Sequence, residues 1–242
     1  RAKNNTYSDQ RKETYQKNLY DLLDAVEKDA LNRLNNFKDQ QIYDGPKKQL
    51  DVIITSLQFL DGSTLNQIPY EIVECLKHAM DDWESTDKFI IVTSLINDAE
   101  AFSYEGWLAT DDNLYNDIQT KYPAINFIHR LVQINLPKAL SRDYLVAVVL
   151  YHELGHFIDT KSSISESLLC VILDGIYLNK FSPEELIYLK KYLPNLTDYI
   201  DDTQRPDWVP MKAGFDPVYY HLMEYFSDIF AAQYVGDMWN IY

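Results

Sequence analysis

The chain lacks both of the apolar segments that would tie it to a membrane. It contains no run of about 18 apolar residues, and its first ten residues, R-A-K-N-N-T-Y-S-D-Q, contain no apolar stretch. A bilayer-spanning helix needs about 20 consecutive apolar residues, and a secretory signal needs a shorter apolar segment near its start. We therefore predict a soluble protein with no membrane span, cytoplasmic rather than secreted.

Basic residues and cysteines are also scarce. The 22 lysines and arginines are outnumbered by 37 acidic residues, and the formal net charge is −15. Nucleic acids and anionic membranes bind positively charged surfaces, so this composition argues against both as partners. The only two cysteines, Cys75 and Cys170, lie far apart in apolar segments. This favours buried free thiols over a disulfide framework.

The most informative stretch is Tyr144 to Asp159, Y-L-V-A-V-V-L-Y-H-E-L-G-H-F-I-D. Its H-E-x-x-H spacing places His152 and His156 one turn apart on one face of a helix, where both imidazoles can bind the same metal ion. Glu153 can then reach a water molecule bound to that ion. The residues before the motif are uncharged and mostly apolar, and burying two histidines and a carboxylate after them would be costly without a partner. We predict a zinc site.

A catalytic zinc ion normally has three protein ligands and one open position, so a further ligand is needed. Among the glutamates after the motif, only Glu224 has an aspartate four residues later, Asp228, on the same helical face. A second carboxylate there can orient a ligand histidine by accepting its free ring N–H. The alternative third ligands are Glu166, Asp174 and Asp159.

The H-E-L-G-H-F-I-D motif followed by a distant E-Y-F-S-D-I-F-A-A-Q-Y-V-G resembles the gluzincin metallopeptidases. The closest resemblance is to the group that includes HtpX and the CAAX prenyl proteases, although this chain lacks their membrane helices. The resemblance implies that His152, His156 and Glu224 bind Zn²⁺ and that Glu153 is the general base. It also implies that Asp228 orients a ligand histidine. The metzincin form is excluded, because Asp159 and Ser162 stand where that form has Gly and His.

Periodicity predicts an α+β fold that is mainly α. Apolar spacing indicates helices over 8–43, 47–60, 69–83, 111–120, 164–178 and 216–235, with Ser8 as a cap of the first and Ser141 or Asp143 as a cap of the motif helix. Ser182-Pro183 with Glu185 predicts another helix start. Strands are predicted over 88–93 and 127–135, with 97–106 continuing or pairing with the first. We expect residues 88–242 to form a zincin-like catalytic core with a small antiparallel sheet ahead of the motif helix, and residues 1–87 to form a helical layer.

These features predict a zinc-dependent metalloendopeptidase that hydrolyses peptide bonds, with a protein or peptide as its substrate. Glu153 would take a proton from the attacking water and pass it to the leaving amine. His221, one turn before Glu224, is the first choice for stabilising the oxyanion, ahead of Tyr219, Tyr220 and Tyr225. The alternatives are a zinc hydrolase of a non-peptide amide or ester and a catalytically silent interaction protein with the same fold.

Overall fold

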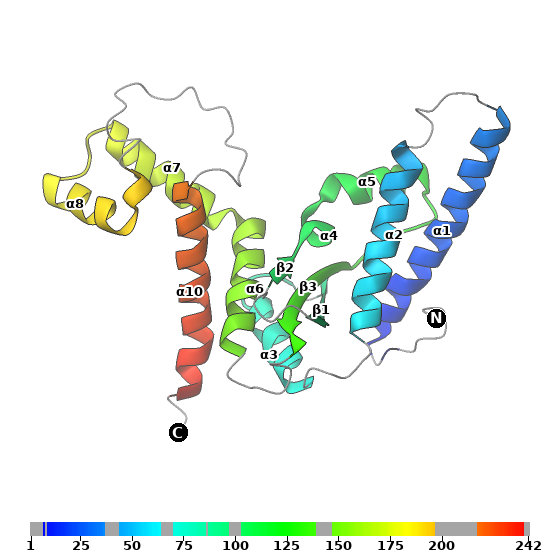
Figure 1. Ribbon diagram of the computed structural model, residues 1–242, viewed down its shortest axis with the longest axis horizontal. Helices are drawn as coiled ribbons and strands as arrows, with labels where there is room; N and C mark the ends of the chain where they lie inside the picture. Colours follow the sequence, from blue (N-terminus) through cyan, green and yellow to red (C-terminus); the bar gives the residue numbers. More distant parts are fainter. Residues whose placement is uncertain are drawn as a thin grey trace. The chain divides into compact units, whose positions relative to one another are not determined.

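The computed structural model describes residues 7, 9–36, 44–63, 70–85, 87–96, 103–138, 147–196 and 217–239. These residues are mainly helical with one small sheet, as predicted (Figure 1). The strands are β1 (Phe89–Ile96), β2 (Ser103–Glu105) and β3 (Arg130–Pro137). The helices are α1 (Gln10–Asn36), α2 (Asp44–Gly62), α3 (Tyr70–Asp81), α4 (Trp107–Thr110), α5 (Asp112–Lys121), α6 (Ala147–Ser162), α7 (Ile164–Tyr177), α8 (Pro183–Tyr192), the 3₁₀ helix η5 (Pro194–Leu196) and α10 (Pro217–Trp239).

Short sequence patterns, such as helix caps and apolar spacing, predicted most of these elements. The Ser182 side chain accepts a hydrogen bond from the Glu185 amide, and the Glu185 carboxylate accepts one from the Ser182 amide, which confirms the capping box that starts α8. Asp111 caps α5 by accepting a hydrogen bond from the Leu114 amide. The predicted caps of the first helix and of the motif helix, at positions 8, 141 and 143, lie outside the described residues.

The prediction of an antiparallel sheet was wrong for its principal strand pair. β1 and β3 are parallel, with Ile90 opposite Leu131 and Thr93 opposite Ile134. Only the short β2 pairs antiparallel with β3, which gives the strand order β1-β3-β2. Parallel strands need a long crossover connection, usually helical. Helices α4 and α5 lie in the connection between β1 and β3 and make the parallel pairing possible.

The chain forms two compact units, Arg1–Glu153 and Leu154–Tyr242, whereas the sequence suggested a boundary after residue 87. The first unit extends past that point because α2 and α3 contact β1, and α2 also contacts β3. These contacts join the early helices to the sheet. The division falls within α6, a single helix that runs without interruption from Ala147 to Ser162.

The first unit has an apolar core with a buried group of hydroxyls inside it. The core is built from α1, α2, β1, α4, α5 and β3 and includes Leu19, Leu22, Val26, Ile53, Leu60, Ile90, Val92, Leu108, Leu114, Ile118 and Leu131. Within it, the Tyr15 and Tyr115 hydroxyls lie 3.0 Å apart, and Tyr115 donates to the Leu108 carbonyl oxygen at 2.6 Å. These bonds satisfy phenols that would otherwise be costly to bury.

The second unit has a smaller core, in which α7 packs against α10 (Figure 1). Its buried members are Leu169, Ile172, Leu173, Leu193, Leu196, Val218 and Leu222. Helix α8 has no buried residue, but the Tyr225 hydroxyl of α10 donates to the Tyr192 carbonyl oxygen at its end, 2.7 Å away. α10 is thus tied both to α7 and to the end of α8.

None of the helices in the described ranges combines the length and the apolar character that a bilayer crossing requires.

Candidate metal centre

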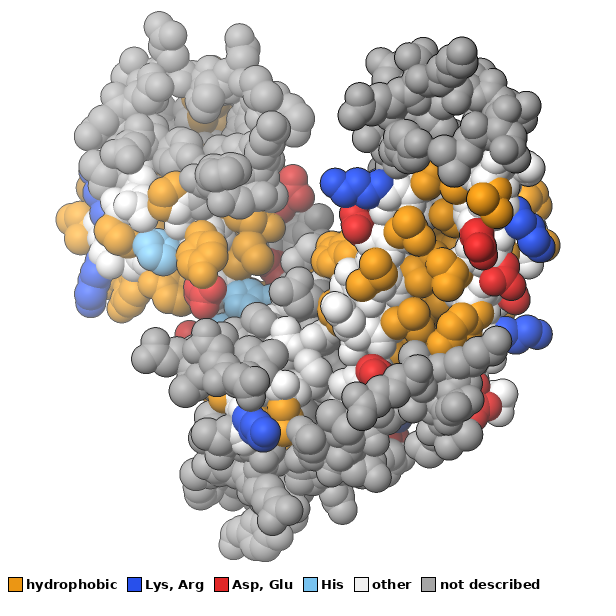
Figure 2. Space-filling model, turned by 45° about the vertical axis from the view of Figure 1, so that its right-hand side comes forward, with side chains coloured by type: hydrophobic (Ala, Val, Ile, Leu, Met, Phe, Trp, Pro, Cys, Tyr) orange, Lys and Arg blue, Asp and Glu red, His pale blue; other side chains and the backbone are white. Residues whose placement is uncertain are grey.

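Three of the predicted metal ligands come together on two helices. α6 carries His152 and His156, and α10 carries Glu224. One ligand atom of each lies within 4.8 Å of the other two, and all three side chains are half-buried. This is the one such group among the residues that the structure describes. On the face shown in Figure 2, histidine side chains lie at the surface among hydrophobic and acidic ones.

The spacing of the ligand atoms suits a shared ion better than a direct bond. The Nε2 atom of His156 lies 3.6 Å from Oε1 of Glu224, beyond hydrogen-bond distance. Two ligands that bind zinc at about 2.0–2.1 Å in tetrahedral geometry lie about 3.3 Å apart. Two imidazole nitrogens and one carboxylate oxygen are also a ligand set typical of catalytic zinc. The residues present therefore fit a zinc ion.

The glycine of the motif brings α6 and α10 close together. Gly155 is buried, and a Cβ at this position would lie 2.8 Å from the Cα of Ser227 and 3.2 Å from its Cβ and Oγ. A Cβ–Cα distance of 2.8 Å is too short for two carbon atoms, so any side chain at position 155 would push the helices apart. The close approach places α10 beside the histidine face of α6.

The close approach creates a contact that sequence reasoning missed. The Oγ atom of Ser227, whose side chain is fully buried, lies 3.1 Å from Nδ1 of His156. This contact leaves Nε2 of the same ring facing Glu224. Two sequence features could have suggested it, the glycine inside the motif and a small hydroxyl residue one helical turn after Glu224. Neither is distinctive without the helix pairing.

Glu153 follows His152 on α6, and its side chain is half-buried. It neighbours the candidate ligands in sequence and on the same helix, as the predicted general base requires. Its catalytic role stays a prediction.

His221 lies on α10 one turn before Glu224 and is not a member of the ligand group. Its ring stacks on Tyr225 with centroids 6.4 Å apart, and its buried Nδ1 has no hydrogen-bond partner among the described residues. Tyr225 donates its hydroxyl proton to a carbonyl oxygen instead. His221 therefore remains the better of these two candidates for stabilising an oxyanion.

The other predicted polar residues have different surroundings. Asp228 has an exposed side chain, and its role in orienting a ligand histidine stays a prediction. Burial and the nearby carboxylates of Asp159 and Glu166 raise the pKa of Tyr219, which keeps its phenol protonated at neutral pH. Tyr220 is 59% exposed, which does not favour it as a fixed donor.

The alternative third ligands do not belong to the group of His152, His156 and Glu224. Glu166 and Asp174 lie on α7 with exposed side chains. Asp159 is buried, but its Oδ1 accepts a hydrogen bond from the Ser165 amide at 2.7 Å and so caps the start of α7. Among the described residues, Glu224 is the carboxylate that joins both motif histidines.

No model of a known protein family matches the chain, and comparisons with curated proteins and with solved structures gave no match. The gluzincin resemblance therefore rests on the two motifs alone, and the family stays a prediction.

Proposed function

We propose that the protein is a zinc-dependent metallopeptidase of the gluzincin type, with a zincin-like catalytic core. The observation that carries this proposal is the group formed by His152, His156 and Glu224, whose ligand atoms converge within 4.8 Å. The motif also includes Glu153, a general base that a site used only for metal storage or structure would not need. The substrate class that best suits this chemistry is a peptide or protein.

In this proposal each side chain has a defined task. A bound zinc ion would lower the pKa of a water molecule toward about 7 and polarise the carbonyl of the substrate. Glu153 accepts the proton of the attacking water and delivers it to the leaving amine as the C–N bond breaks. His221 donates a hydrogen bond to the carbonyl oxygen as negative charge develops on it.

The first experiment is the metal content of the purified protein after reconstitution with zinc and removal of excess metal. We expect about one zinc ion per chain in the wild type and much less in Glu224→Ala, because two histidines alone hold zinc weakly. The matched control is Glu166→Ala, which removes an exposed carboxylate from α7. A wild type that takes up no zinc overturns the proposal. Zinc retained by Glu224→Ala but lost from Glu166→Ala moves the third ligand to α7.

The second experiment is digestion of an unfolded protein substrate, followed by mass spectrometry of the fragments. Cleavage should stop when a chelator removes the metal and return when zinc is restored. Full metal loading without any cleavage, across substrates of varied sequence, would overturn the peptidase function. Hydrolysis of small esters or amides by that same preparation would favour the non-peptide alternative.

A further inference from the structure

The contact between Ser227 and His156 assigns a role to two residues that the motifs do not name. We infer that Ser227 is a positioning residue, which orients His156 for metal binding, and that Gly155 allows it to do so. This inference rests on the metal site of the proposed function. It concerns how the site is built and requires no particular substrate.

The two nitrogens of the His156 ring face different groups. Nε2 faces Glu224 at 3.6 Å, and Nδ1 lies 3.1 Å from the Ser227 hydroxyl. A histidine that binds metal through Nε2 carries its proton on Nδ1, and that N–H needs an acceptor that also holds the ring in place. In the metal-bound state Nδ1–H donates to Oγ of Ser227. The opposite tautomer would place a proton on Nε2, where the ion must bind.

Glu224 and Ser227 are three residues apart, so they share one helical face one turn apart. A single face of α10 therefore supplies both a metal ligand and the hydrogen-bond partner of another ligand. The ring of His156 lies between the two. A rotation of the imidazole would break the hydrogen bond to Ser227 and would also turn Nε2 away from Glu224.

Gly155 lets Ser227 approach the ring of His156. The Oγ atom of Ser227 belongs to one of the shortest polar side chains, so it reaches the ring only if the two backbones lie close together. A Cβ at Gly155 would meet the Ser227 backbone at 2.8 Å, and a backbone atom cannot move aside as a flexible side chain can. Gly155 thus sets the helix separation at which a serine hydroxyl can serve the ligand.

Ser227 also differs chemically from the aspartate that the sequence suggested for this task. A hydroxyl is neutral, whereas a carboxylate would add a negative charge next to the ring. With two neutral imidazoles and one carboxylate, a Zn²⁺ site oriented in this way keeps a net charge of about +1. A more positive site withdraws more electron density from its ligands and from bound water.

The test is the zinc affinity of the whole chain, measured by competition with a chromophoric chelator. We expect Ser227→Ala to weaken zinc binding about ten- to hundredfold, the usual effect of removing the partner of a ligand histidine. The matched control is Ser165→Ala. Ser165 is another buried serine of the same unit, but its hydroxyl has no hydrogen-bond partner among the described residues. Equal affinities of wild type and Ser227→Ala would overturn the inference.

A second measurement reports on the ring itself. In ¹H–¹⁵N NMR spectra of the zinc-loaded wild type, the His156 Nδ1–H proton should exchange slowly with water, because it is hydrogen-bonded to the buried Ser227 side chain. In Ser227→Ala it should exchange faster, whereas a purely packing role for the serine would leave it unchanged. A zinc-loaded wild type without a protected Nδ1–H on His156 would overturn the inference.

These outcomes separate the inference from the proposed function. Zinc binding that depends on Ser227, in a protein that cleaves no substrate, would remove the peptidase function and support the inference. Cleavage that persists in Ser227→Ala, with unchanged zinc affinity, would support the peptidase function and overturn the inference. Thermal unfolding of each variant in chelator should match the wild type, which shows that the metal-free fold is intact.

Discussion

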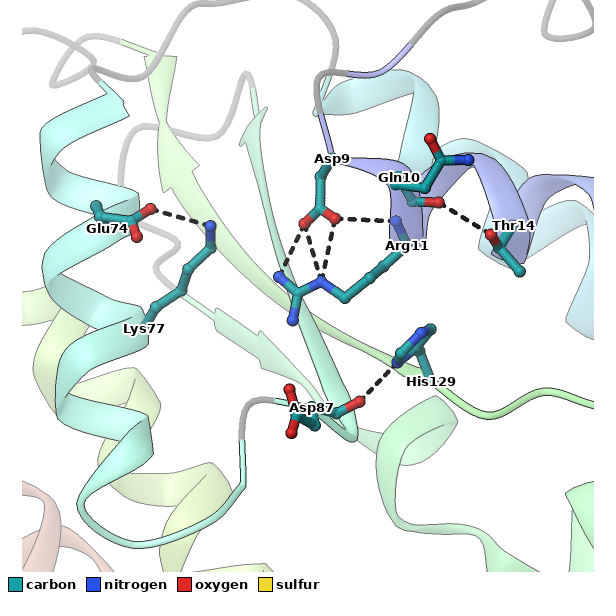
Figure 3. Close-up of polar contacts among 8 residues, drawn as sticks. All are labelled: Asp9, Gln10, Arg11, Thr14, Glu74, Lys77, Asp87 and His129. Atoms are coloured by element: carbon teal, nitrogen blue, oxygen red, sulfur yellow. Dashed lines mark hydrogen bonds and ion pairs between the residues drawn. The ribbon is translucent and has the colours of Figure 1, made fainter.

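Two polar clusters in this protein each contain histidine and carboxylate side chains, but they differ in what these groups face. Near the start of α1, the Arg11 guanidinium donates to both carboxylate oxygens of Asp9, with distances of 2.8–3.3 Å (Figure 3). Lys77 pairs with Glu74 at 3.0 Å on α3, and His129 contacts the Asp87 carbonyl oxygen at 2.6 Å. In this cluster cations and donors meet anions and acceptors.

The cluster on α6 and α10 is arranged differently. Oε1 of Glu224 lies 3.6 Å from Nε2 of His156, beyond hydrogen-bond distance, and both atoms are of a kind that binds metal ions. A hydrogen bond between Ser227 and His156 holds the other side of the ring. The comparison separates a cluster of paired opposite charges, which stabilises the fold, from a group of converging metal-binding side chains, which suits the cation site that we propose.

The largest effect is expected from Glu153→Gln. The amide keeps the shape of the side chain but cannot accept the proton, so turnover should fall about 10²- to 10⁴-fold while zinc content stays unchanged. Initial rates on a cleaved peptide, together with metal analysis, measure this. Glu166→Gln, an exposed change on α7, should retain full activity. Unchanged turnover in Glu153→Gln would rule out Glu153 as the general base.

Next in size is the effect of zinc on stability. At a zinc concentration about 100 times its Kd, the wild type should gain about 2.7 kcal/mol in the free energy of unfolding. His156→Ala should gain far less, although its metal-free stability should be close to that of the wild type. Urea unfolding with zinc and with chelator measures both. His78→Ala, an exposed change on α3, should keep the full gain; a similar gain in His156→Ala would contradict the assignment.

Arg11→Met should show the opposite behaviour, with lost stability and no change in zinc binding. Burial favours a raised pKa for Asp9, but the hydrogen bonds from Arg11 outweigh it and lower that pKa below 3.8. The stabilisation is therefore complete above pH about 4 and is lost as the pH falls through the folded-state value. We expect a loss of about 1 kcal/mol at pH 7 that shrinks in acid, measured by urea unfolding at several pH values.

The matched control for Arg11→Met is Lys48→Met. Lys48 is 58% exposed, and its Nζ lies 3.9 Å from the Asp111 carboxylate, so its removal should change stability little. An equal loss in both variants, or a loss in Arg11→Met that grows in acid, would contradict the paired-cluster interpretation.

The smallest expected effect concerns Lys12, beside the same cluster. Burial lowers its pKa to about 8, so the unfolded chain binds more protons than the folded one between pH about 8 and 10.5. Stability should then rise with pH across that window. Lys12→Met should increase the free energy of unfolding by on the order of 1 kcal/mol at pH 7, and the gain should shrink by pH 10. The exposed Lys17→Met on α1 should show neither effect; a gain independent of pH would contradict the role of charge burial.

Much of the local structure could be predicted because its causes lie within a few residues. The capping box of Ser182 and Glu185 and the helical spacing of the two motif histidines depend on neighbours three or four positions away. The pairing direction of β1 and β3 could not be read in this way. Two apolar strands look alike in either direction, and here the connection through α4 and α5 decides between them.

The sequence by itself determined the pair His152 and His156, the neighbouring Glu153 and the helices that carry the site, because helix periodicity and capping are local. Only the tertiary structure brought Glu224 to both histidines and placed Ser227 against the ring of His156. It also showed why the motif contains Gly155, through a contact with a helix more than 60 residues later. The physical reason is that these contacts depend on the distance between two helix axes, which side chains from distant parts of the chain set together.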